Sequence, residues 1–109
     1  MEARLFLLQR FSAAVLAPLV LLHLGSILYA VEVGLSAEAI LARTRGSFWW
    51  GACYGLFVIA AAIHAPIGLR AVLAEWLGWR GRGANAALLI FGLMLASLGI
   101  RAVYAVVAP

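Results

Sequence analysis

Three long apolar stretches constrain this chain more than any other feature of its sequence. They cover about residues 11–31, 48–74 and 84–107. Each is long enough for the roughly 20 residues with which an α-helix crosses a bilayer. Since 67% of the 109 residues are hydrophobic and 11% are charged, the chain has more apolar surface than a soluble core of this size can hide. We therefore predict an all-α membrane protein, one domain over residues 1–109, with three transmembrane helices.

The arginines predict how these helices are oriented in the membrane. A three-helix topology places one group of positive charges on the side of the N-terminus: Arg4, Arg10, Arg70, Arg80 and Arg82. The first connection, on the other side, carries Arg43 and Arg45. Cytoplasmic segments are enriched in arginine and lysine, so we expect a cytoplasmic N-terminus. The net charge of +4 then reflects topology, and no basic patch interleaved with aromatic residues indicates nucleic-acid binding.

Short-range signals add detail to this arrangement. Ser36 is a good N-cap residue and predicts a short interfacial helix through Leu41 that ends before Gly46. In the third stretch, Gly92 and Gly99 lack side chains and allow a neighbouring helix to approach closely.

Two histidines, His23 and His64, lie inside the first and second apolar stretches. An ionisable side chain at membrane depth is costly without a partner and therefore indicates a functional site. A neutral imidazole is also a common haem ligand. The alternative is a structural histidine that bonds to a carbonyl or hydroxyl group of a neighbouring helix, and this alternative remains open for both residues.

The depths of the two histidines differ. At 1.5 Å per residue, we place His23 roughly 18 Å from the cytoplasmic side and His64 roughly 10 Å from it. Two axial ligands of one haem have nitrogens only about 4 Å apart. Either each histidine faces a histidine of another subunit, or His23 is not a ligand. Near His64, Pro66 loosens the helix, and Gly68 removes a side chain that would obstruct a flat macrocycle.

Two motifs resemble a known family. They are Gln9-Arg10-Phe11-Ser12 at the start of the first helix and His64-x-x-x-Gly68-x-Arg70, which continues to Glu75-Trp76. Both are similar to motifs in the membrane-anchor subunits of succinate dehydrogenase and fumarate reductase. The chain departs from both anchor types of that family. Glu75-Trp76 stands where the smaller anchor has Asp-Tyr, and Ala71 stands where the larger anchor has a second histidine.

The resemblance implies a haem b-containing anchor subunit that does no covalent chemistry itself. His64 and, with less support, His23 are the implied axial ligands of one or two haem irons shared with a partner subunit. The implied partners are a flavoprotein with FAD, an iron–sulfur subunit, a second membrane anchor and the lipid bilayer. The implied location is the bacterial inner (cytoplasmic) membrane.

The resemblance also implies a quinone site at the cytoplasmic ends of the first two helices. There Arg10 and Ser12 are expected to hydrogen-bond a quinone or a haem propionate. Trp76 is expected to cover the quinone ring, with Arg70 and Glu75 in electrostatic roles.

Two other classes of membrane protein remain open. One is a non-redox scaffold or assembly subunit with structural histidines. The other is a small transporter or channel protomer, which is disfavoured because no acidic residue lies in the middle of an apolar stretch.

Overall fold

The computed structural model describes residues 2–109. It consists of α1 (Ala3–Val33), α2 (Ala37–Thr44), α3 (Phe48–Leu77) and α4 (Arg82–Val107). Residues 2–109 contain no β-strand. Three of the helices, α1, α3 and α4, are long and apolar enough to span a membrane, which confirms the predicted fold class.

The long helices extend beyond the apolar stretches. They contain 31, 30 and 26 residues and are therefore about 39–46 Å long, against roughly 30 Å of hydrocarbon. The main difference is at α1, which begins at Ala3 instead of near residue 11. Hydropathy predicts the part of a helix that lies in the hydrocarbon of the membrane, whereas backbone hydrogen bonds determine where the helix begins and ends. Residues such as Gln9 and Arg10 are good helix formers, so the helix continues through them.

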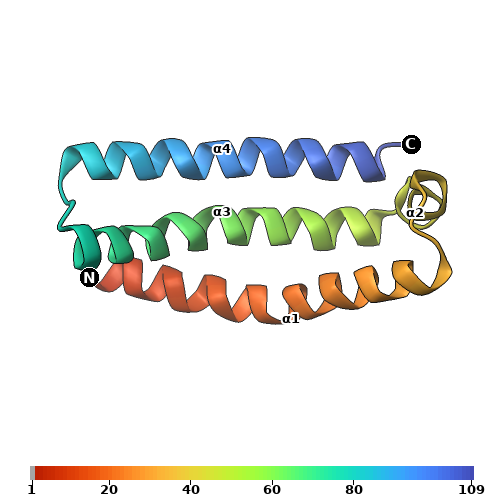
Figure 1. Ribbon diagram of the computed structural model, residues 1–109, viewed down its shortest axis with the longest axis horizontal. Coiled ribbons are helices and arrows are strands. Elements are labelled where there is room, and N and C mark those ends of the chain that lie inside the picture. The colour runs from red at the N-terminus through yellow and green to blue at the C-terminus, as the bar shows by residue number, and fades with distance from the viewer. Residues whose placement is uncertain (1) are drawn as a thin grey trace.

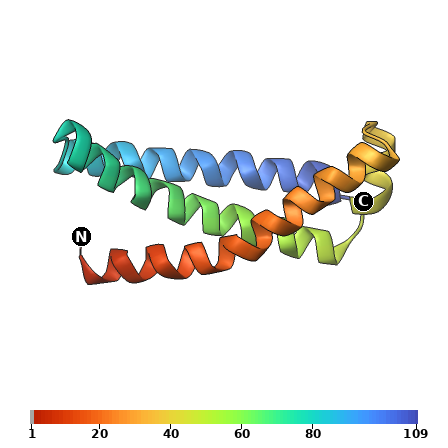
Figure 2. The same ribbon diagram turned by 60° about the horizontal axis from the view of Figure 1, so that its bottom comes forward.

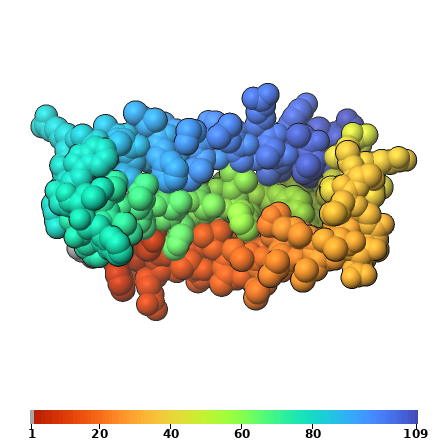
Figure 3. Space-filling view, viewed as in Figure 1, coloured from red at the N-terminus to blue at the C-terminus, as the bar shows by residue number. Residues whose placement is uncertain are grey.

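The three long helices lie antiparallel, with α3 between α1 and α4 (Figure 1). Turning the molecule shows that α1 crosses α3 at an angle (Figure 2). A strip of α3 remains visible between the outer two helices in the space-filling view (Figure 3). We call the end where α1 begins and α3 meets α4 the amino-terminal end. The opposite end, closed by α2, is the α2 end.

Small residues bring α4 close to α3, as predicted. A Cβ atom placed on Gly92 would lie 3.1 Å from Pro66 Cγ, and one on Gly99 would lie 2.5 Å from Val58 Cγ1. Among residues 2–109, only five apolar side chains are buried, namely Ala30, Ala60, Ile67, Ala84 and Leu88. The core is therefore thin, and most large apolar side chains point outward, where a bilayer or another protein chain would cover them.

The predicted short helix is present as α2, with Ser36 Oγ accepting a hydrogen bond from the Ala39 backbone N–H at 3.1 Å. Thr44 ties this helix to the end of α4, because its hydroxyl donates to the Val106 carbonyl at 2.6 Å. The Gly46 backbone N–H adds a bond to the Val107 carbonyl at 2.7 Å. These bonds hold α2 across the end of the bundle.

Candidate functional site

The best-defined polar contact between the long helices joins α1 to α3. Ser12 Oγ lies 3.2 Å from His64 Nδ1, and Ser12 is only 3% exposed. The Ser12 hydroxyl hydrogen is already donated to the Gln9 carbonyl at 3.1 Å. With the hydrogen on that carbonyl, Ser12 Oγ accepts from His64, and in the matching tautomer Nδ1 carries the proton and Nε2 keeps its lone pair. This is the tautomer in which a histidine binds a metal through Nε2.

One helical turn away from this contact, the Gln9 side chain of α1 lies against Gly68 of α3. A Cβ atom on Gly68 would lie 3.1 Å from Gln9 Nε2. Gly68 therefore makes room for the Gln9 side chain, and the space we expected to be open for a macrocycle is filled from α1. Gln9 Oε1 is buried without a hydrogen-bond partner in the described chain. Buried polar atoms are normally satisfied, so this oxygen is an unused acceptor next to the Ser12–His64 contact.

His23 lies in a different environment at the α2 end. Its ring packs edge-on against Tyr54, with centroids 5.9 Å apart, and tilted against Phe57 at 5.5 Å. Its ring nitrogens make no hydrogen bond to residues 2–109, so both are available to a ligand. Ser12 marks the level of His64 on α1, and His23 lies eleven residues further along that helix, about 16 Å away. The two histidines therefore cannot be the axial pair of one haem.

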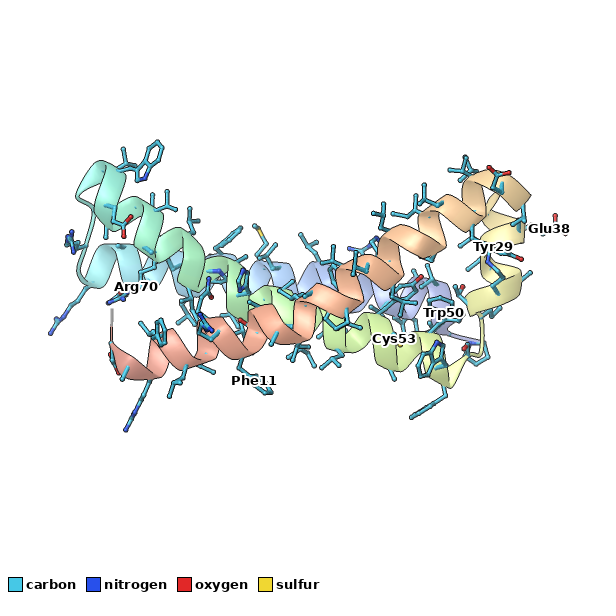
Figure 4. The ribbon with its side chains drawn as sticks, turned by 90° about the horizontal axis from the view of Figure 1, so that it is seen from below. Phe11, Tyr29, Glu38, Trp50, Cys53 and Arg70 are labelled. Carbon is cyan, nitrogen blue, oxygen red and sulfur yellow. The ribbon has the colours of Figure 1, made fainter. Side chains whose placement is uncertain are left out.

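His23 lines a cavity of about 370 Å³ that we call the α2-end cavity. Residues from all four helices form its wall: His23, Ser26, Ile27, Ala30, Ile40, Arg43, Thr44, Trp50, Tyr54, Phe57, Val58, Gly99, Ala102, Val103 and Val106. Figure 4 shows Tyr29, Trp50 and Cys53 at this end and Arg70 at the opposite end. The two candidate regions are thus well separated along the bundle.

At the amino-terminal end, a groove of about 630 Å³ runs along α3 and α4. Its polar lining, which we call its head, consists of Glu2, Arg70 and Asn85. Arg70 Nε donates to Asn85 Oδ1 at 3.4 Å. Its other walls include Ile67, Leu88 and Gly92. A smaller hollow of about 210 Å³ lies beside the same pair and is also lined by Glu75. An apolar groove with a few polar groups at one end suits an amphipathic ring compound.

The structure does not bring Arg10 and Trp76 together. The contacts of α1 with α3 place Arg10 at the level of Ile67, and Trp76 lies nine residues further along α3, about 14 Å away. Arg10 is exposed, with its guanidinium carbon 5.9 Å from the centroid of the Phe6 ring. Trp76 is 81% exposed. Neither residue contacts His64, so within this chain they do not form one pocket.

Sequence reasoning missed Gln9, Asn85 and Arg43 as site residues. Asn85 carried a usable signal, because an amide near the start of an apolar helix commonly faces a polar neighbour. Gln9 and Arg43 carried none that distinguishes them from helix-end polar residues. No group of three or more His, Cys, Asp or Glu side chains in residues 2–109 is placed to hold a metal ion.

Comparison with protein families agrees with this geometry. Residues 1–100 match the model of the succinate dehydrogenase/fumarate reductase transmembrane subunit family. The chain belongs to this family. No curated protein and no solved structure matches it.

Apart from Ala102, Val103 and Val106 of the α2-end cavity, the site residues discussed above lie within the region that matches the succinate dehydrogenase/fumarate reductase transmembrane subunit family. The chain is therefore a membrane subunit of such a complex, which confirms the family suggested by its motifs. In this family context, the Ser12–His64 contact and the Arg70–Asn85 groove are the features that most need a functional explanation.

Proposed function

We propose that this chain is the haem b-binding membrane anchor of a succinate:quinone oxidoreductase. The observation that carries the proposal is the Ser12–His64 contact, which engages Nδ1 and leaves Nε2 without a hydrogen-bond partner among residues 2–109, inside a membrane helix. The donor set fits a haem, because an axial imidazole whose second nitrogen is hydrogen-bonded is the usual arrangement. A bound haem would accept and pass on single electrons.

The second axial ligand of this haem must come from a partner subunit. His64 and His23 are the only histidines of the chain, and they lie about 16 Å apart along the helices. We therefore propose that His64 ligates one haem and His23 a second haem, each completed by a second membrane anchor. His23 supports this role because its ring nitrogens are free beside the α2-end cavity.

The groove at the amino-terminal end is our candidate quinone site. Arg70 and Asn85 supply a donor and an amide at its head, and a quinone needs such groups at its carbonyl oxygens. The apolar wall suits the ring and its tail. Glu75 lies next to this head, in the adjoining hollow.

The remaining expected site residues face away from the chain. Arg10 and Trp76 are exposed, so we propose that they contact quinone or a haem propionate only together with a partner subunit. The proposed partners are a flavoprotein with FAD, an iron–sulfur subunit and a second anchor. We propose that the amino-terminal end faces the cytoplasm of a bacterium, where the peripheral subunits bind.

Replacement of His64 tests the haem assignment. In the complex purified from membranes, His64→Ala should remove one b-type haem or shift it to high spin, because the iron loses an axial ligand. The reduced-minus-oxidised absorbance spectrum measures this change. A spectrum that stays low-spin and undiminished would contradict the assignment and favour a scaffold with a structural histidine.

Replacement of Arg70 tests the quinone site. Arg70→Gln should lower succinate:quinone activity by about tenfold, the effect of losing one interaction of about 1.4 kcal/mol. Succinate oxidation with an artificial acceptor, which takes electrons upstream, should be unchanged. Arg80→Gln is the matched control, because Arg80 is exposed and lines the small hollow but not the groove. Normal quinone reduction in Arg70→Gln would place the quinone site elsewhere.

A further inference from the structure

The α2-end cavity contains one cationic side chain, Arg43, to which the proposed function gives no role. Arg43 comes from α2 and His23 from α1, and both line this cavity. The wall between and around them is mostly apolar and includes Ile27, Val103 and Val106. A ligand held by His23 would therefore share its space with this guanidinium.

The guanidinium of Arg43 is held in place but not neutralised. Nη1 donates to the Ala39 carbonyl at 3.1 Å, and the guanidinium carbon lies 5.1 Å from the centroid of the Tyr29 ring. Nε and Nη2 make no hydrogen bond within residues 2–109. No carboxylate of the described residues pairs with Arg43. The side chain is half-buried, and most of its donors remain free for a ligand.

An unpaired cation next to an apolar cavity favours an anionic ligand. Removing a charge from water costs several kcal/mol unless an opposite charge compensates it. Arginine is also the side chain best suited to bind carboxylates, because its planar fork donates two parallel hydrogen bonds. Haem b has the matching chemistry, since it is an apolar ring that carries two carboxylates on one edge.

We propose that Arg43 binds the propionate carboxylates of the haem that His23 ligates. This inference rests on the proposed function, because it requires a haem at His23. It adds a residue from α2, a helix outside the three membrane spans, to the binding site. In this role Arg43 would set both the orientation of the ring and the charge beside it.

The test is a redox titration of the haems in the complex purified from membranes. A positive charge near a haem favours the reduced iron, because the ferrous form carries one positive charge less. Arg43→Gln should therefore lower the midpoint potential of the haem that is lost in His23→Ala. The haem that is lost in His64→Ala should keep its potential, and it reports that the complex is folded. Arg43→Lys keeps the charge and should retain most of the wild-type potential.

Arg45→Gln is the matched control. Arg45 follows α2, is exposed and lines a separate hollow with Glu38, so its replacement should change neither potential. If Arg43→Gln changed neither the midpoint potentials nor the haem content, the role of Arg43 would be wrong, but the ligand role of His23 would be unaffected. If His23→Ala left the haem spectrum unchanged, both the ligand role of His23 and the inference about Arg43 would be wrong.

Discussion

A single hydroxyl group, that of Ser12, lies against one ring nitrogen of His64. With its own hydrogen on the Gln9 carbonyl, Ser12 accepts from Nδ1. Ser12→Ala removes this acceptor, so the imidazole donates less electron density to a ferric iron. We expect the midpoint potential of the haem proposed at His64 to rise and the affinity for haem to fall by about 10–100-fold, as when other hydrogen-bond partners of a metal-binding histidine are removed. A redox titration and the haem content measure the two effects.

Two variants control for other consequences of this change. Ser12→Thr keeps the hydroxyl and should retain the wild-type potential. Ser26 is a serine of α1 that also donates to a backbone carbonyl, that of His23 at 2.7 Å, but it lies far from His64. Ser26→Ala should leave the His64 haem unchanged. Equal potentials in Ser12→Ala and the wild type would show that the contact does not tune the site.

At the scale of elements, the closest approach of α4 to α3 depends on Gly99. A Cβ atom there would lie 2.5 and 2.8 Å from the two methyl groups of Val58. Valine is stiff at χ1 and cannot easily move them away. Gly99→Ala should therefore destabilise the bundle by about 1–3 kcal/mol, as overpacking does. The melting temperature of the purified complex in detergent measures this loss.

A double variant separates overpacking from other effects at this position. Val58→Ala combined with Gly99→Ala removes the two methyl contacts and leaves only the Val58 Cβ, 3.2 Å from the added atom, so it should recover much of the lost stability. Gly55→Ala is the control, since no atom lies within 4 Å of the added Cβ. An equal melting temperature for Gly99→Ala and the wild type would mean that the helices do not pack this closely.

At the scale of the whole molecule, the bundle leaves most of its apolar surface uncovered. Among residues 2–109, five buried apolar residues make a thin core, and α1 and α4 lie on opposite sides of α3, with the short α2 contacting both at one end (Figure 1). We therefore expect the chain to require partner subunits for stability. Purification through a tag on this chain should recover a flavoprotein, an iron–sulfur protein and a second hydrophobic subunit, as identified by mass spectrometry. A stable, monodisperse oligomer of this chain alone would contradict this expectation.

Much of the fold could be predicted because it depends on local patterns. Apolar length predicts each membrane helix, the cap residue Ser36 predicts α2, and Gly92 and Gly99 predict close packing. The site was predicted only in part. His64 and Ser12 were singled out separately, but their contact joins residues 52 positions apart. It depends on the register between α1 and α3, which no local pattern specifies.

The sequence by itself determined that the chain forms three membrane helices and which histidines lie within them, because burying apolar residues and satisfying the backbone in lipid leave few alternatives. Only the tertiary structure decided what each side chain meets. Helix register placed Ser12 on His64 and filled the space at Gly68 with Gln9. It also separated Arg10 from Trp76. These contacts change when one helix shifts by a single turn along its neighbour, whereas the helices themselves form in either register.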